Sequence, residues 1–330
     1  MFCKVCGEKL TPNNLYSKDK RFCDSCGTKH SEYIKDRRNT LQSLREMNLE
    51  SKIIQTKYLI KQAVAEFGLD HVYISYSGGT VLSHIAKSIY PDILHLFANT
   101  TNEYPETLQH IKWEKDCNGT NIISVLPIDG HGESWNFKKV VCHYGYPMFS
   151  KRIANAIRTC QHALTERTQN NSLEYIDRNF KKYKKYIDDP ISDKCCEKLK
   201  KYPLKRKARE LGLKCSIIGI LASESYQREK DWLEYGCNVF HERKDNQSRP
   251  LSFWTEEDIQ EYIDRYNVRI SDLYYMGYKR NGCMYCGFGV NLEEDGKNRY
   301  QRLKQTHPAQ YNYFVKNFGD LMISFDIPFS

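Results

Sequence analysis

The sequence predicts an α/β protein whose central sheet is doubly wound and mostly parallel. Short apolar segments at 72–76, 92–98 and 120–128 alternate with segments of helical period. Strands that alternate with helices at this spacing form a parallel sheet with helices on both faces. At 330 residues the chain has room for one or two domains and an appendage. Cysteine-rich segments lie before and after this core, and they predict a small zinc-ribbon-like module at the N-terminus and a helical, cysteine-bearing C-terminal part.

The N-terminal segment predicts a zinc-binding module. Its two CxxC units, "CKVCG" and "CDSCG", are each followed by a glycine that permits a tight knuckle. Four thiolates on two knuckles close a tetrahedral site for a metal such as zinc, with chance spacing and a rubredoxin-like iron site as the alternatives. Such modules hold a small fold together and often dock a partner. The expected zinc ligands are Cys3, Cys6, Cys23 and Cys26.

Further elements follow in chain order. Apolar residues recur at helical spacing from about Ser31 to Phe67, which predicts one buried helical face. "CSIIGILA" predicts a central buried strand, and Gly236 ends the helix in "ESYQREKDWLEYG". Thr255 caps another helix, whose first turn is acidic. The remaining elements are a strand at 72–76, a helix at 81–89, a strand at 92–98, a helix opening at "YPETLQHI" and a strand at 120–128.

Four parts of the chain follow from these patterns. Residues 1–30 form the zinc module, and residues 31–70 form a helical connection. The α/β domain covers 71–245 and contains a charged helical insertion at about 148–210. Residues 246–330 form the C-terminal part, which contains the second CxxC-bearing segment.

Composition and charge narrow the class of protein. Hydrophobic residues make up 40% and charged residues 28%, as in ordinary soluble proteins, and the apolar runs are too short to span a bilayer. "MFCKVCGEKL" lacks the plan of a signal peptide, so we expect a cytoplasmic protein with no membrane partner. The net charge is +9, with basic clusters in "RNFKKYKKY" and "KLKKYPLKRKARE". Solvated helix faces and a nucleic-acid surface explain these clusters about equally well.

A second group of four cysteines lies later in the chain. "DKCCEKLKKYPLKRKA" carries an adjacent pair, and "RNGCMYCGFGV" carries a CxxC beside glycines. Each half alone fits buried thiols, a redox pair or half a zinc site. Together they offer four thiolates in an electropositive setting, which lowers thiol pKa values and suits an anionic cluster. The basic residues of this setting are Lys194, Lys198, Lys200, Lys201 and Arg280.

Several segments, in order, resemble the phosphoadenosine phosphosulfate (PAPS) reductase family within the PP-loop ATP pyrophosphatase superfamily. "SYSGG" is similar to its first-strand loop. "FANTTNEYPETL" is similar to its second-strand segment, although Asn99 stands where Asp is usual. "GILASESYQR", "RPLSFWTEEDI" and "LYYMGYKRNGCMYCGFG" resemble three later motifs. The resemblance covers residues 50–315 or so, and it implies an adenine nucleotide alpha hydrolase-like fold.

The resemblance also implies roles for individual residues. The second cysteine group is similar to the [4Fe–4S] ligands of the family's iron–sulfur branch, with a second zinc site as the alternative. Glu224, Arg228 and Arg280 would act in catalysis by orienting phosphate or metal, although an i,i+4 ion pair competes as the role of the first two. The implied cluster ligands are Cys195, Cys196, Cys283 and Cys286, and the implied nucleotide- and phosphate-binding residues are Ser77, Gly78, Gly79, Thr80, Asn99 and Thr100.

The loop after the first strand is unusually short. ATP pyrophosphatases commonly read Ser-Gly-Gly-Lys-Asp-Ser-Thr-Val-Leu, whereas this chain reads Ser-Gly-Gly-Thr-Val-Leu from Ser77. Either three residues are deleted between Gly79 and Thr80, or residues of a mobile loop are missing from the printed sequence. The flanks are in register on both sides, which favours the second interpretation. A true deletion would remove a phosphate-binding cation and an acidic group.

The resemblance implies two reaction types. In the first, which we expect here, ATP with Mg²⁺ adenylates an acceptor, pyrophosphate leaves, and the acceptor takes sulfur, as in DNA-phosphorothioation-type enzymes. The acceptor would be nucleic acid, and a cysteine desulfurase or another sulfur donor would be a partner.

The second type is a PAPS or adenosine phosphosulfate reductase, which uses a thiol and releases sulfite. Its nucleophile is a cysteine on a C-terminal tail, and no cysteine follows Cys286, which counts against it. A non-catalytic nucleotide-binding protein is a third interpretation if the loop is truly short.

Overall fold

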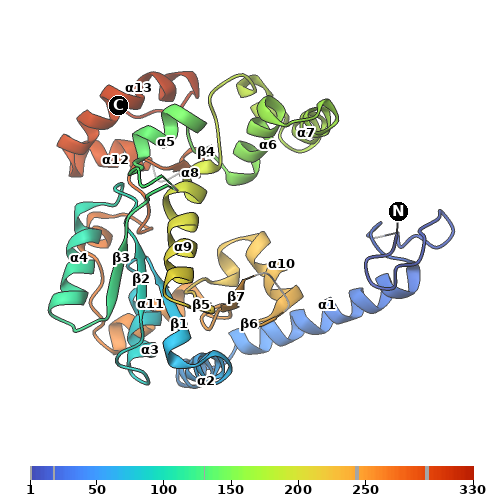
Figure 1. Cartoon of the computed structure of the whole chain (residues 1–330), viewed down its shortest axis with the longest axis horizontal. Coiled ribbons are helices and arrows are strands. Elements are labelled where there is room, and N and C mark those ends of the chain that lie inside the picture. The colour runs from blue at the N-terminus through green and yellow to red at the C-terminus, as the bar shows by residue number, and fades with distance from the viewer. Residues whose placement is uncertain (1, 18, 130, 242–244, 294–296) are drawn as a thin grey trace. The chain divides into compact units, whose positions relative to one another are not determined.

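A computed structural model covers the chain and describes residues 2–17, 19–129, 131–241, 245–293 and 297–330 (Figure 1). The chain forms two compact units, each assembled from several stretches of sequence. The four contiguous parts drawn from the sequence divide the chain differently and remain a prediction. No helix in the described ranges is both long and apolar enough to cross a membrane. Unit 1 consists of Met1–Ile74, Thr80–Ile93 and Lys214–Arg269, and unit 2 of Ser75–Gly79, Leu94–Leu213 and Ile270–Ser330.

The strands pair mostly in parallel. Strand β5 pairs in parallel with β1 and β7, and β6 runs antiparallel to β7. In unit 2, β2 pairs in parallel with β3. Three of these four pairings are parallel, which confirms the predicted fold class. The strands are β1 (Val72–Tyr76), β2 (His95–Ala98), β3 (Ile122–Val125), β5 (Cys215–Ile217), β6 (Asn238–Val239) and β7 (Asn246–Ser248).

The helices of unit 1 follow the predicted order, with one difference. The helical run expected from Ser31 to Phe67 is two helices, because Asn48 is extended and its side chain caps the second by accepting a hydrogen bond from Ser51 N at 2.9 Å. Gly236, at a φ of 74°, ends α10 as predicted. The helices are α1 (Asp24–Arg45), α2 (Leu49–Phe67), α3 (Thr80–Lys87), α10 (Tyr226–Tyr235) and α11 (Glu256–Arg265).

A buried ion pair joins α2 to the start of α11. Lys52 Nζ lies 2.5 Å from Asp258 Oδ2, and the Lys52 side chain is 2% exposed. Thr255 caps α11 as predicted, and its backbone N–H donates to the same Asp258 oxygen at 2.7 Å. The Asp258 carboxylate therefore serves both the helix cap and the lysine, which fixes the two helices against each other.

Unit 2 is largely helical, as predicted for residues 148–210. A two-residue parallel pairing of β4 (Met148–Phe149) with β8 (Gly287–Phe288) connects the insertion to the second cysteine segment. The helices are α4 (Pro105–Asp116), α5 (Phe137–Tyr144), α6 (Lys151–His162), α7 (Glu166–Asn179), α8 (Lys194–Cys196), α9 (Tyr202–Glu210), α12 (Arg299–Thr306) and α13 (Pro308–Ser324).

The core of unit 2 is rich in aromatic rings. Tyr300 and Phe314 stack with their centroids 4.3 Å apart, and Phe314 also contacts Phe318. Tyr146 is fully buried in the same cluster and donates a hydrogen bond to the carbonyl of Tyr285 at 2.5 Å. Because Tyr285 lies inside the second CxxC motif, the core holds the backbone of that motif in place.

Candidate functional site

A cavity of about 200 Å³ in unit 2 opens where β1 and β2 end. Ser77 follows β1 in its wall, and Phe97 and Ala98 of β2 lie in the wall as well. In open α/β sheets, ligands bind at the carboxyl ends of parallel strands. Later segments complete the wall with Glu103, Thr107, Lys200, Lys201, Asn281 and Gly282.

Asn281 lies against the glycine loop. A Cβ atom on Gly78, whose φ is 87°, would come within 2.3 Å of Asn281 Nδ2, so only glycine permits this close approach. Thr107 Oγ1 donates to Asn281 Oδ1 at 2.5 Å, which orients the amide. Asn281 Nδ2 is buried and has no hydrogen-bond partner among the residues that the structure describes. It is therefore a donor available to a ligand oxygen in the cavity.

The structure contains the short form of the loop. Ser77 and Gly78 form a bend, and α3 begins at Thr80, directly after Gly79. Thr80 is buried, whereas Ser77 and Gly79 are exposed. Gly79 and Thr80 are consecutive residues of the 330-residue chain, so the expectation that loop residues are missing between them is wrong. The cations of the cavity wall are Lys200 and Lys201 rather than a lysine of the loop.

The second cysteine group is brought together in unit 2. Burial raises the pKa of Cys195 well above its ordinary value, and the nearby thiols of Cys283, Cys196 and Cys286 add to the effect. Burial, together with Cys283 and Cys196, raises the pKa of Cys286 to about 12. These thiol pKa values are raised, because burial outweighs the basic setting that was expected to lower them.

Lys200 lies in the cavity wall and interacts electrostatically with Cys283 of the second cysteine group. Burial would lower the pKa of Lys200, but the charges of Cys283 and Glu103 outweigh it and hold the pKa above its ordinary value. Glu103 accepts a hydrogen bond from Thr100 Oγ1 at 2.7 Å, and the same hydroxyl lies 3.7 Å from Cys283 Sγ. The hydroxyl of Thr100 thus bonds within this network, and the nucleotide-binding role implied for Thr100 stays a prediction.

A local irregularity places Lys200. The chain from Glu197 to Lys201 forms a π-helical turn between the double cysteine and α9. Pro203 stands in the first turn of α9. Proline has no N–H to donate, and its ring clashes with the carbonyl four residues earlier, so a regular α-helix cannot run through this point. The wider turn leaves Lys200 in the cavity wall.

The other implied residues lie as follows. Glu224 and Arg228 form the competing i,i+4 ion pair in unit 1, and their catalytic role stays a prediction. Arg280 is exposed, next to Asn281 in the chain. Asn99 Oδ1 accepts a hydrogen bond from Thr101 N at 3.0 Å.

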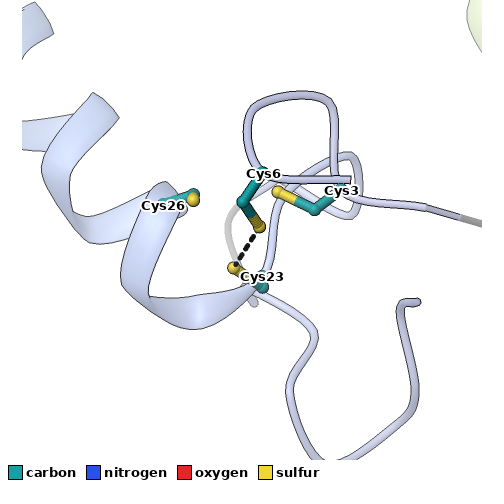
Figure 2. A group of neighbouring side chains, drawn as sticks. All are labelled: Cys3, Cys6, Cys23 and Cys26. Atoms are coloured by element: carbon teal, nitrogen blue, oxygen red, sulfur yellow. Dashed lines mark hydrogen bonds between the residues drawn. The ribbon is translucent and has the colours of Figure 1, made fainter. Parts of the chain in front are cut away.

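The N-terminal quartet has the geometry of a single-metal site (Figure 2). The sulfurs of Cys3, Cys6, Cys23 and Cys26 all lie within 4.8 Å of one another. The backbone N–H groups of Cys6 and Cys23 lower the pKa of Cys3 to about 6, which favours a thiolate. A metal ion would therefore find one ligand already deprotonated at neutral pH.

Helix α1 carries this module within unit 1. It begins at Asp24, between the last two cysteines of the quartet, and packs on α10. The Arg37 guanidinium lies 4.4 Å from the Trp232 ring centroid and donates to the Trp232 carbonyl at 3.3 Å. His30 contacts Glu234 at 3.2 Å.

Comparison with known proteins identifies the part of the chain that holds the thiols. Residues 148–288 match the model of the phosphoadenosine phosphosulfate reductase domain. The matched stretch includes the four cysteines of the second group together with Lys200 and Asn281. The match begins after the glycine loop, so Ser77, Gly78 and Asn99 lie outside it.

Relatives of the chain carry related names. An adenosine 5'-phosphosulfate reductase of Mycolicibacterium smegmatis is 24% identical over 228 residues, which are 69% of this chain and 75% of that protein. One of Anoxybacillus flavithermus is 31% identical over 103 residues, which are 31% of this chain and 42% of that protein. A crystal structure of PAPS reductase from Candida auris is 15% identical, with a TM-score of 0.44 over 75% of this chain and 93% of the other.

Sequence reasoning missed part of the cavity wall. Glu103, Thr107 and Asn281 received no role, and Lys200 counted only as part of an electropositive segment. Glu103 and Thr107 lie inside "FANTTNEYPETL", and Asn281 directly precedes "GCMYC". Their position within the quoted motifs was the signal that could have found them.

Proposed function

We propose that this chain is a sulfonucleotide reductase that acts on adenosine 5'-phosphosulfate or its 3'-phosphorylated form. The observation that carries the proposal is the position of Lys200. This residue lies in the wall of the cavity of about 200 Å³, which we call the phosphate cavity, and it interacts electrostatically with Cys283. Lys200 and the Asn281 amide would bind a dianionic phosphosulfate group. The relatives named as adenosine 5'-phosphosulfate reductases support the same choice.

The proposed reaction needs two thiols, which a reduced dithiol such as thioredoxin or dithiothreitol supplies, because we assign the second cysteine group to a cluster and no cysteine follows Cys286. A thiolate attacks the sulfur of the phosphosulfate, the bond from sulfur to the bridging phosphate oxygen breaks, and AMP (or its 3'-phosphorylated form) leaves with the electron pair. A second thiolate then attacks the sulfur of the first thiol, which forms a disulfide and releases sulfite. The sulfur of the substrate is reduced by two electrons and the two thiols are oxidised. Lys200 would stabilise the charge of the leaving group and of the sulfonate.

We propose a [4Fe–4S] cluster on Cys195, Cys196, Cys283 and Cys286. The four thiols lie near one another, as the ligands of such a cluster would. In the described ranges only the N-terminal quartet has the sulfur spacing of a single-ion site, so a larger inorganic group suits the second quartet. Arg299 donates to the Cys286 carbonyl at 3.0 Å, which adds positive charge beside an anionic centre. When bound, such a cluster supplies negative charge and a redox-active centre next to the substrate pocket.

The ATP-dependent sulfur-transfer reaction is a second candidate. The observation that favours it is the Ser-Gly-Gly loop at the end of β1, where backbone N–H groups and a following helix suit a pyrophosphate leaving group. It would need Mg²⁺, a nucleic-acid acceptor and a sulfur donor such as a cysteine desulfurase. Glu224, Arg228 and Arg280 would orient the phosphates or the metal ion.

One pair of assays separates these functions. Reduced protein with its metals is incubated with adenosine 5'-phosphosulfate and thioredoxin or dithiothreitol, and sulfite is measured. A parallel reaction contains ATP, Mg²⁺ and single-stranded DNA or RNA, and pyrophosphate is measured. We expect sulfite in the first reaction. Pyrophosphate release that depends on nucleic acid would establish the second candidate, and nucleotide binding with neither product would establish the non-catalytic alternative.

A further inference from the structure

A second cavity of unit 2 takes no part in the site described above. It measures about 500 Å³, enough for a nucleotide, and it is open to solvent. The first residues of α5 and of α13 line it, and Figure 1 shows these two helices side by side. Tyr285, the last residue before Cys286, also lines it. The CxxC segment therefore contributes Tyr285 to this cavity, and Gly282 just before it lines the phosphate cavity.

The floor of the cavity is aromatic. Tyr285 and Tyr313 stack with centroids 5.7 Å apart and planes 26° apart. The ring centroid of Phe137 lies 5.9 Å from that of Tyr285. Tyr285 is buried, whereas Tyr313 is 44% exposed. An exposed ring that is supported from behind by a second stacked ring is a rigid platform on which a flat base can stack.

The rim of the cavity is polar. Asn136 and Gln310 carry amide groups that can bond the edge of a base, and Lys138 is exposed and can contact a phosphate. Asn136 uses its carbonyl oxygen to cap α5 by accepting from Lys139 N at 2.8 Å, so its NH₂ group is what it offers a ligand. Thr101, also in the wall, has a φ of 62°. A β-branched residue in this conformation is strained, and such strain is common at binding sites.

The positive charge of unit 2 favours the binding of a polyanion. The segment 148–213 contains 17 Lys and Arg but 8 Asp and Glu, so it carries as large an excess as the net +9 of the whole chain. Several of these cations form ion pairs, including Lys184 with Asp177 and Arg158 with Asp193. The remaining excess still raises the rate of encounter with nucleic acid and makes binding depend on salt.

We propose that this cavity binds one unstacked nucleotide of a single-stranded nucleic acid, with its base on Tyr313 and its phosphate near Lys138. The proposal goes beyond the reductase function, because the sulfonucleotide is proposed to bind in the cavity that Lys200 and Asn281 line, which shares no lining residue with this one. Its test is binding, so it stands or falls independently of turnover.

The test uses the full chain and oligonucleotides of about twelve residues with one 2-aminopurine, as DNA and as RNA. Stacking on Tyr313 is expected to quench the 2-aminopurine fluorescence. Tyr313→Ala is expected to abolish the quenching and to weaken binding about tenfold, since stacking on one aromatic ring contributes on the order of tenfold in affinity. Tyr313→Phe keeps the ring and is expected to bind like the wild type. Lys138→Ala is expected to lower the slope of log K against log salt by about one.

A matched control is Tyr275→Ala, since Tyr275 is 79% exposed in unit 2 and lines neither cavity. It should bind and quench like the wild type. Quenching with DNA, with RNA or with both supports the proposal and identifies which nucleic acid binds. Three results overturn it: no binding, quenching unchanged in Tyr313→Ala while that variant is folded by circular dichroism, or full displacement of the oligonucleotide by AMP.

Discussion

Lys200 lies between two parts of the site, the wall of the phosphate cavity and the Cys283 thiol. The charges of Cys283 and Glu103 hold the pKa of Lys200 above its ordinary value. A cation at this position suits the binding of an anionic substrate that we propose. Its position depends on a single backbone feature, the π-helical turn at Glu197–Lys201.

Replacing Lys200 tests this role. Lys200→Gln is expected to weaken the binding of adenosine 5'-phosphosulfate by about 10- to 100-fold, since a hydrogen bond to a charged group contributes about 1.5–3 kcal/mol. Isothermal titration calorimetry measures the change. Lys198→Gln is the control, because Lys198 stands on the same turn with its ammonium 5.1 Å from the Tyr144 ring centroid. Equal affinity in wild type and Lys200→Gln would remove Lys200 from the site.

Gly78 and Gly79 form a matched pair for the loop. Gly78→Ala places a Cβ 2.3 Å from Asn281 Nδ2 at a φ of 87°, whereas a Cβ on Gly79 meets nothing within 4 Å. We expect Gly78→Ala to displace Asn281 and to weaken nucleotide binding at least tenfold, or about 1.4 kcal/mol. Gly79→Ala should bind nearly as the wild type does. Similar losses in both variants would show that Asn281 is not the cause.

Among the elements, α2 and α11 depend on one buried charge pair. Lys52→Met removes the cation and leaves the Asp258 carboxylate with the cap of α11 alone. We expect a loss of about 3 kcal/mol in the free energy of unfolding, the usual cost of breaking a buried pair. Urea denaturation followed by circular dichroism measures it. Lys61→Met, on an exposed part of α2, is the control and should change stability by less than about 0.5 kcal/mol.

Among the elements, local sequence patterns predicted helix caps and strands better than they predicted where a helix breaks. Thr255, Gly236 and the strand 72–76 were predictable, because capping, helix termination and burial are local properties of the chain. The break before α2 was not, because Asn48 within a helical pattern is also a tolerated helix residue. The sequence did not predict the π-helical turn either, because Pro203 is compatible with an ordinary helix start at α9.

For the whole molecule, the two cysteine groups predict two different metals. Wild-type protein is expected to contain zinc, iron and acid-labile sulfide. The double variant Cys3→Ser/Cys6→Ser should lose zinc and keep iron, and Cys283→Ser/Cys286→Ser should lose iron and keep zinc. Elemental analysis and a sulfide assay measure this. Loss of both metals in either variant, or zinc in both sites, would contradict the assignment.

Removal of the zinc has a local consequence. The apolar cluster of the module consists of Cys3, Phe22 and Cys23, with Leu10, Tyr16 and Cys26 packed against it. Such a cluster is too small to fold a module without metal. A zinc chelator is expected to make residues 2–23 sensitive to trypsin while the rest of the chain stays protected. Protection of these residues in chelator would show that the module folds without metal.

The sequence by itself determined the class of fold and the two groups of four cysteines, of which the N-terminal one has the spacing of a metal site. These follow from local spacing: the alternation of strands and helices, and pairs of cysteines on knuckles. Only the tertiary structure decided that Lys200, Glu103, Thr107 and Asn281 meet in one cavity, and that Tyr285 and Tyr313 form a second one. The residues of the first cavity come from positions as far apart as Glu103 and Asn281, which are 178 positions apart. Their meeting depends on how the core packs, which no local pattern records.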